Sequence, residues 1–289
     1  MLTVLFAVLS FFCAFAAPPL VDIVYDIDQT IATLVHDGPG GDWLADPLNP
    51  QKNIFSITYD RPEVDSMNQP ILDPTGKPIT TRVSERYRVY EGFVEEMEKW
   101  RRDIAAGRVR ISFFSGGHVA RNRALLDAIK LKDGSSVRTL VTDKQIHGRE
   151  SMVATGVGPE GRVRERFKKD LRTINPDLSH VILVDDIPNF VPDSQLHHVV
   201  WLDEDFPYPE RLGGRGMIVP TAPRIQQERD KFKRISRMVD EALVLHRESG
   251  VPFSQAIRRT VGPVHGMGRP CTPDDLFQVL NGLIQSAAR

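Results

Sequence analysis

Short apolar runs alternate with amphipathic segments along this sequence, and the alternation strongly limits the folds that the chain can adopt. The runs at residues 21–25, 109–114, 180–184 and 198–202 are rich in Val, Ile and aromatic residues, a composition typical of buried strands. A further strand is expected at residues 137–141. Strands that alternate with helices form a mostly parallel sheet covered by helices on both faces. The sequence therefore predicts an α/β fold with three layers.

The segments between these runs show helical periodicity. Phe93, Met97, Trp100 and Ile104 recur at the spacing of one helix face, and Gly107 is placed to end that helix. A second helix is expected after residue 117, and the apolar face through Phe232, Ile235, Val239, Ala242 and His246 predicts a third.

Two parts of the chain interrupt the alternation. Residues 36–88 are rich in Pro, Gly, Asn and Asp, with a strong turn signal at residues 73–77 between two short strands. We interpret them as a small loop and strand insertion in an α/β core at residues 20–205. Residues 206–289 are expected to form a mainly helical C-terminal extension with a short strand at 217–219 and a last helix capped by Thr272.

The first 16 residues are uncharged and end in Ala14-Phe15-Ala16, a pattern typical of a secretory signal peptide cleaved after Ala16. We therefore expect an exported protein, either periplasmic or secreted. Because this segment has no Lys or Arg, an uncleaved membrane anchor is the alternative. After cleavage Cys271 is the only cysteine, so no intrachain disulfide can form.

Charge and composition exclude some classes of protein. Lys and Arg number 37 against 38 Asp and Glu, and the formal net charge of -1 argues against a dedicated nucleic-acid binder. The chain is 41% hydrophobic and 26% charged, which is ordinary for a globular protein with a sizeable core.

Polar side chains collect where three of the predicted strands end. They are Asp26 and Asp28, Ser115 and Gly116, and Asp185 and Asp186. The carboxyl ends of parallel strands lie at one edge of a sheet, so these side chains should share a crevice. Four carboxylates there would repel one another unless a cation neutralised them, and an all-oxygen donor set favours Mg2+.

These residue types suit phosphoryl transfer. One carboxylate can attack phosphorus and form an aspartyl-phosphate, while a second can protonate the leaving oxygen and then activate water. Ser115 and the backbone amide of Gly116 can hydrogen-bond a phosphoryl oxygen. A lysine is still needed to balance charge, and Lys168 and Lys169 precede the strand at 180–184.

At these positions the sequence resembles the phosphatases of the haloacid dehalogenase superfamily. Asp26-Ile27-Asp28-Gln29-Thr30 resembles their first motif, DxDxT, and Ser115, Lys169 and Asp185-Asp186 resemble the second, third and fourth. Residues 169–186 are similar to the NLI-interacting-factor-like group, which includes phosphatases of the RNA polymerase C-terminal domain. The resemblance extends over residues 20–202.

The resemblance implies a Rossmann-like parallel sheet and a Mg2+-dependent phosphatase that hydrolyses phosphomonoesters through an aspartyl-phosphate. The implied roles are these: Asp26 as nucleophile, Asp28 as general acid/base, Asp26, Asp28, Asp186 and Asp185 as the metal site, and Ser115, Gly116 and Lys169 as phosphate-binding residues. The substrate would be a phosphorylated small molecule or a phosphoprotein. No nucleic-acid partner is expected, and no stable membrane association unless the N-terminal segment is retained.

Two positions depart from the group. Gln29 stands where that group usually has an acidic residue, and Asp186 stands where it usually has Asn. Specificity for the polymerase tail is therefore not carried over. The alternative function is a non-catalytic binding module with the same fold, against which the intact Asp26, Asp28 and Lys169 argue, since decayed enzymes usually lose such residues.

Overall fold

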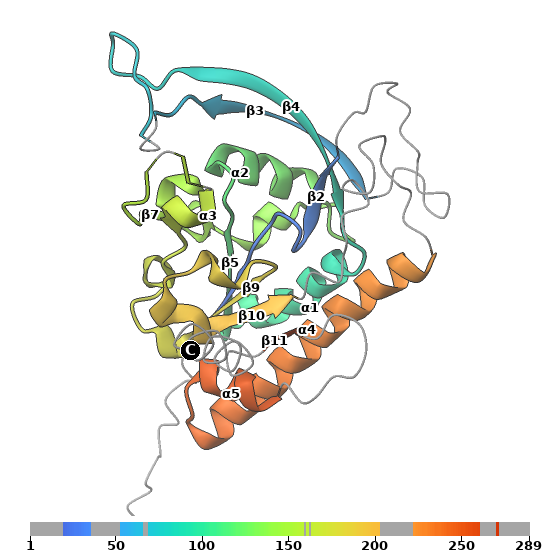
Figure 1. Ribbon diagram of the computed structural model, residues 1–289. Coiled ribbons are helices and arrows are strands. Elements are labelled where there is room, and N and C mark those ends of the chain that lie inside the picture. The colour runs from blue at the N-terminus through green and yellow to red at the C-terminus, as the bar shows by residue number, and fades with distance from the viewer. Residues whose placement is uncertain are drawn as a thin grey trace, which may run out of the picture.

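The fold is built on a six-stranded sheet of order β11-β10-β9-β1-β5-β6, in which all strands but β11 are parallel (Figure 1). The computed structural model describes residues 20–35, 53–65, 69–158, 160–161, 163–202, 222–260 and 270–271. The strands of this sheet are β1 (Val21–Tyr25), β5 (Val109–Phe114), β6 (Ile146–His147), β9 (Val181–Asp185), β10 (Val199–Leu202) and β11 (Pro270–Cys271). The predicted α/β class with a parallel sheet is confirmed.

The two faces of the sheet are covered differently. The main core joins alternate strand residues such as Ile23 and Ile111 to α1 (Phe93–Ala105), α2 (Val119–Ala128), α4 (Ala222–Ser249) and α5 (Phe253–Thr260). On the other face Val24 and Leu183 belong to a smaller cluster with residues of the short turns between 171 and 198.

The remaining elements are short. They are helix α3 (Val163–Arg166), strands β7 (Val153–Ala154) and β8 (Phe167–Lys168), and 3-10 helices at Val137–Leu140, Asp143–Gln145, Arg149–Ser151, Leu171–Thr173, Leu178–His180, Pro188–Phe190 and Asp193–His198.

Helix α1 follows the predicted periodicity. Phe93, Met97 and Trp100 are fully buried, and Gly107, with φ of 66°, follows the end of the helix. Gly92 precedes the helix with φ of 92°, and a Cβ at this position would lie 3.2 Å from the backbone of Arg229 in α4. Glycine is therefore required both for the backbone conformation and for the close approach of α4.

A second, antiparallel sheet of order β2-β4-β3 consists of β2 (Ala32–Val35), β3 (Ile54–Pro62) and β4 (Thr80–Val89). Figure 1 shows the β3–β4 hairpin arching over α2. The turn at residues 73–77 is confirmed, since the Asp73 N–H donates to the Lys77 carbonyl over 2.8 Å. The strands, with 9 and 10 residues, are longer than the short strands predicted.

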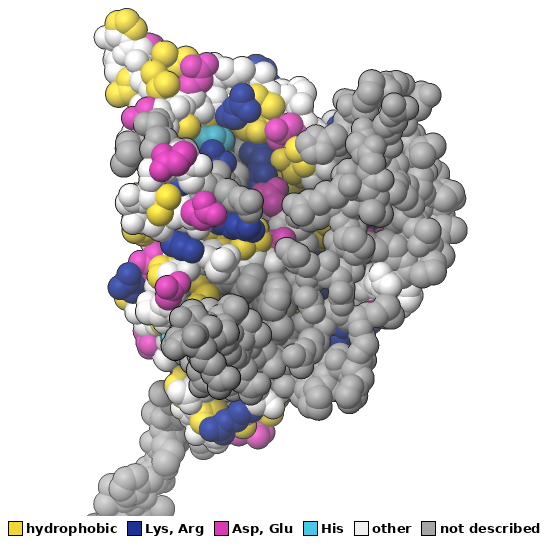
Figure 2. All heavy atoms as spheres, viewed as in Figure 1, with side chains coloured by type: hydrophobic (Ala, Val, Ile, Leu, Met, Phe, Trp, Pro, Cys, Tyr) yellow, Lys and Arg dark blue, Asp and Glu magenta, His cyan; other side chains and the backbone are white. Residues whose placement is uncertain are grey.

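Charged side chains on the hairpin explain this difference. Ile57, Tyr59, Tyr87 and Val89 are buried, whereas Asp60, Arg61 and Arg82 of the same strands are exposed and obscure the strand pattern in the sequence. On the face seen in Figure 2, basic and acidic side chains are interspersed below the hairpin.

The prediction of a strand at 137–141 is wrong, because Val137–Leu140 forms a 3-10 helix. Val137 and Val141 are buried, as they would be in a strand. The backbone N–H of Thr139 and its hydroxyl both donate to the Ser136 carbonyl, over 3.0 and 2.6 Å, which stabilises a helical turn locally. Strand β6 instead pairs with β5 at the edge of the sheet.

Helix α4 confirms the predicted apolar face of the C-terminal extension, since Phe232, Ile235, Val239, Ala242 and His246 are all buried. The predicted signal peptide, the strand at 217–219 and the helix after Thr272 lie outside the described residues. Among the residues that the structure describes, no helix is long and apolar enough to cross a membrane.

A buried ion pair joins α4 to the second sheet. Arg88 of β4 donates to both carboxylate oxygens of Glu228, over 2.9 and 2.5 Å, and the Glu91 backbone N–H donates to the same carboxylate over 3.1 Å. The Glu228 side chain has no exposed surface. Removing one partner of such a pair leaves the other charge buried without compensation.

We expect Glu228→Ala to lower the free energy of unfolding by about 3–5 kcal/mol, since it strips a buried arginine of its counter-ion. Denaturant unfolding followed by circular dichroism measures this. Glu248→Ala, an exposed position on the same helix, is the matched control and should change stability little. Equal effects of the two substitutions would contradict the structural importance of the pair.

Candidate functional site

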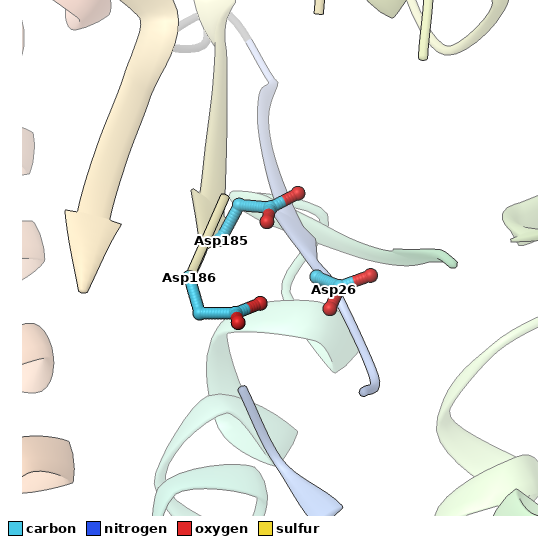
Figure 3. Close-up of side chains that lie close together, drawn as sticks. All are labelled: Asp26, Asp185 and Asp186. Atoms are coloured by element: carbon cyan, nitrogen blue, oxygen red, sulfur yellow. The ribbon is translucent and has the colours of Figure 1, made fainter. Parts of the chain in front are cut away.

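The parallel register places the ends of β1 and β9 side by side. Tyr25 pairs with Val184, and the Asp26 N–H donates to the Val184 carbonyl over 2.9 Å. Asp26 therefore follows β1 at the level where Asp185 ends β9. Figure 3 shows the carboxylates of Asp26, Asp185 and Asp186 close together, and one oxygen from each lies within 4.8 Å of the others. We call these three residues the acidic trio.

Lys169 lies between two members of the acidic trio. Its Nζ donates to Asp26 Oδ1 over 2.6 Å and to Asp185 Oδ2 over 2.7 Å, and its side chain has no exposed surface. Burial alone would lower the pKa of Lys169, but Asp185 and Asp26 raise it above its usual range. Lys169 therefore carries a positive charge at neutral pH. Its neighbour Lys168 contacts the Asn189 carbonyl instead.

If all three were ionised, the carboxylates of the acidic trio would carry more negative charge than Lys169 balances. Burial raises the pKa of Asp26 from 3.8 to about 7, with Asp185 and Asp28 adding to the rise and Lys169 opposing it. Burial also raises the pKa of Asp186 well above its usual value, and repulsion from Asp185 and Asp26 raises it further. Carboxylate oxygens at this spacing suit a hard divalent cation such as Mg2+. The residues present thus fit the predicted metal.

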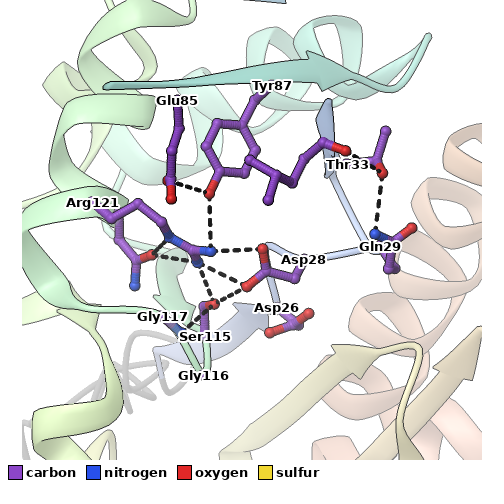
Figure 4. Close-up of polar contacts among 12 residues, drawn as sticks. Asp26, Asp28, Gln29, Thr33, Glu85, Tyr87, Ser115, Gly116, Gly117 and Arg121 are labelled. Carbon is purple, nitrogen blue, oxygen red and sulfur yellow. Dashed lines mark hydrogen bonds and ion pairs between the residues drawn. The ribbon is translucent and has the colours of Figure 1, made fainter. Parts of the chain in front are cut away.

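Asp28 has different hydrogen-bond partners from the acidic trio. Its two oxygens accept hydrogen bonds from both ends of the Arg121 guanidinium, over 2.7 and 2.8 Å, and the Ser115 hydroxyl donates to Oδ2 over 2.6 Å (Figure 4). Burial alone would raise the pKa of Asp28, but Arg121 and Ser115 hold it below its usual value. The predicted metal residues are therefore divided, with Asp26, Asp185 and Asp186 in one group and Asp28 in another.

Sequence reasoning missed Arg121, which α2 positions in its first turn. A basic residue there is unfavourable because the N-terminus of a helix already carries partial positive charge. A basic residue at this unfavourable position indicates an acidic partner, and this was the one signal in the sequence that could have pointed to Arg121. The predicted phosphate-binding glycine, Gly116, packs beside Phe190, since a Cβ there would lie 3.3 Å from the Phe190 ring, and its carbonyl accepts a hydrogen bond from Arg149 Nε over 3.0 Å.

The turn after Asp28 is held from two directions. Gln29 has φ of 64°, a left-handed conformation that is unfavourable for a residue with a side chain. The Tyr90 hydroxyl donates to Gln29 Oε1 over 2.9 Å, and buried Lys231 of α4 donates to the Thr30 carbonyl over 2.8 Å. Lys231 was also missed from the sequence, because its neighbours in α4 form an ordinary amphipathic pattern.

Comparisons with known proteins found distant structural similarity only. No protein-family model matches the chain, and no curated protein matches it. The chain is similar to the structure of Fcp1, an essential RNA polymerase II CTD phosphatase, at 14% identity and a TM-score of 0.47, with 83% of this chain and 70% of that chain covered. It is similar to fission yeast Fcp1 bound to beryllium fluoride at 14% identity and a TM-score of 0.42, with the same coverage.

Both are phosphatases of the RNA polymerase II C-terminal domain, the group that the sequence motifs resemble. At this identity and with both TM-scores below 0.5, the similarity assigns neither a family nor a function to this chain.

We compare the free energy of unfolding of the metal-free wild type with that of the metal-free Asp26→Asn variant. The value for wild type should fall relative to that of the variant as the pH rises from about 4 to about 7. Asp26 keeps its proton in the folded state through this window, whereas the unfolded chain has lost it, so folding binds protons and is favoured at the acidic end. The change should be at least about 1 kcal/mol, given about 1.4 kcal/mol per pKa unit.

Denaturant unfolding in excess chelator at a series of pH values measures this difference, with Asp127→Asn on the exposed side of α2 as the control. Added Mg2+ should reduce the loss, because it binds the ionised carboxylates of the folded state. If the free energy of unfolding of wild type instead rises relative to that of Asp26→Asn between these pH values, the raised pKa of Asp26 is refuted.

Proposed function

We propose that this protein is a Mg2+-dependent phosphatase of the haloacid dehalogenase type, which hydrolyses phosphomonoesters through an aspartyl-phosphate on Asp26. One observation carries the proposal: the acidic trio and Lys169 meet at the carboxyl edge of the parallel sheet, with a further carboxylate two residues from Asp26. Ligands of open α/β sheets bind at this edge.

Asp26 is the proposed nucleophile. Its carboxylate attacks the phosphorus, the bond from phosphorus to the leaving oxygen breaks, and the phosphoryl group is transferred to the carboxylate. Lys169, 2.6 Å from Asp26, favours the ionised form that this attack requires. Asp26, Asp185 and Asp186 would hold Mg2+, whose charge offsets that of the phosphoryl oxygens.

Asp28 is the proposed general acid/base. It donates a proton to the leaving oxygen in the first step, and in the second step it takes a proton from the water that hydrolyses the aspartyl-phosphate. Hydrogen bonds from Arg121 and Ser115 favour the ionised form, which is the form needed to activate water. Before the first step Asp28 must therefore bind a proton.

The proposed substrates are phosphorylated small molecules or phosphoproteins. The uncharged N-terminal segment supports the further proposal that the protein acts outside the cytoplasm. Purified protein should release phosphate from part of a panel of phosphopeptides, sugar phosphates, nucleotides and aryl phosphates, and chelation of divalent ions should abolish this release. Turnover that persists in excess chelator would refute the metal assignment. A failure to hydrolyse any member of the panel would favour the binding module.

Substitutions at the two aspartates should separate their roles. Asp26→Asn should form no covalent intermediate. Asp28→Asn should still be phosphorylated by nitrophenyl phosphate, whose leaving group needs little protonation, and should accumulate phospho-enzyme because water is no longer activated. Losing a general acid costs about 10²–10⁴-fold in rate, and esters with poor leaving groups should lose most.

Rapid mixing of Asp28→Asn with nitrophenyl phosphate should give a burst of nitrophenol, and mass spectrometry should map an acid-stable phosphate to Asp26. The exposed variant Asp127→Asn should behave as wild type. A phosphate on any other residue would overturn the assignment of the nucleophile.

A further inference from the structure

We propose that Arg121 is a positioning residue, which fixes the orientation of the Asp28 carboxylate and the Ser115 hydroxyl for acid/base catalysis. The inference rests on the proposed phosphatase function. Arg121 is buried and reaches the site from α2, six residues after Ser115. Figure 4 shows its guanidinium between Tyr87, Asp28 and Ser115.

The hydrogen bonds of Arg121 favour positioning over substrate binding. Nη1 donates to Asp28 over 2.7 Å and to the Tyr87 hydroxyl over 3.3 Å. Nη2 donates to Asp28 over 2.8 Å and to Ser115 over 2.6 Å, and Nε donates to Asn122 over 3.0 Å. A guanidinium has five N–H groups, and these protein acceptors engage all of them. A phosphoryl oxygen could bind Arg121 only by displacing one of these acceptors.

The hydroxyl of Ser115 also makes all of its hydrogen bonds with protein groups. It donates its single proton to Asp28 Oδ2 over 2.6 Å, and it accepts hydrogen bonds from Arg121 Nη2 and from the Gly117 backbone N–H over 2.6 and 3.1 Å. Ser115 therefore orients Asp28 in this structure, in addition to the phosphate-binding role that the sequence predicts. Both oxygens of Asp28 are thus fixed by donors from α2 and the segment before it.

Gly117 leaves space for the Arg121 guanidinium, and Tyr87 contacts it. A Cβ at Gly117 would lie 2.2 Å from Arg121 Cζ, so no larger residue fits while Arg121 keeps this position. On the other side the Tyr87 ring centroid lies 5.6 Å from Cζ, and the Tyr87 hydroxyl is itself oriented by donation to Glu85 over 2.9 Å. The β3–β4 hairpin thereby contributes to the position of a catalytic carboxylate.

The two-ended contact also fixes the rotation of the Asp28 carboxylate. A planar guanidinium donates a hydrogen bond to each carboxylate oxygen, whereas a lysine ammonium would act as a point charge and allow the carboxylate to turn. Without the pair of hydrogen bonds, the Asp28 carboxylate would be free to rotate away from the leaving oxygen. The expected defect therefore lies in proton transfer and grows as the leaving group becomes more basic.

Arg121→Lys tests this on a series of phosphate esters whose leaving groups have increasing pKa. We expect kcat to fall by about 10²-fold for the most basic leaving group and by less than about tenfold for nitrophenyl phosphate, with KM unchanged. Arg123→Lys, at an exposed position on the same helix, should match wild type throughout the series. Circular dichroism and cooperative unfolding establish that each variant is folded.

Gly117→Ala provides an independent test, because its methyl group displaces the guanidinium without removing it, and it should reproduce the steeper dependence on the leaving group. Tyr87→Phe should give a weaker effect of the same kind and carries the test if the other variants do not fold. Equal losses for all leaving groups, or a rise in KM alone, would overturn the positioning role while the proposed function stands. A wild type inactive on the whole series would overturn both.

Discussion

The ion pairs of Lys169 with Asp26 and Asp185 are the interaction on which the rest of the site depends. Burying an isolated carboxylate is costly, and β1 and β9 bring two of them together inside the protein. An ammonium group 2.6 and 2.7 Å from their oxygens offsets part of this cost. Because both strands are parallel and adjacent, the carboxylates cannot separate without disrupting the sheet. The topology therefore requires a buried cation at this edge.

The charged residues of the site fall into two groups, each with its own ion pairs. Lys169 and the acidic trio form the group proposed to hold a divalent cation and to supply the nucleophile. Asp28 and Arg121 form the second, held together by two short hydrogen bonds. Because Arg121 balances the charge of Asp28, fewer uncompensated carboxylates remain to repel one another at the proposed metal site. Asp26 and Asp28 lie only two positions apart in the sequence, yet they have different surroundings.

The sequence predicted the parallel sheet and the elements that carry the site because these depend on local patterns. The β-branched runs and the spacing of Phe93, Met97 and Trp100 are visible within short windows, and the motif around Asp26 is contiguous. The 3-10 helix at Val137–Leu140 was missed because a local hydrogen bond to Ser136 outweighed a strand-like pattern. Lys231 was missed because its partner lies far away in the chain and no local pattern indicates it. The partner of Arg121 is equally distant, and the one local signal for it was a basic residue in the first turn of a helix.

The hydrogen bond from Lys231 to the Thr30 carbonyl spans 201 residues, and this separation has a consequence for the order in which the protein folds. The turn beside Asp28 contains the left-handed Gln29, whose strain must be offset by contacts made elsewhere. One of these contacts comes from α4, which leaves the ribosome long after β1. Closing a loop of this length is entropically costly and slow. The nascent chain therefore carries the residues of all four motifs before it has the helix that completes their geometry, so the proposed site should be complete only after α4 has been synthesised.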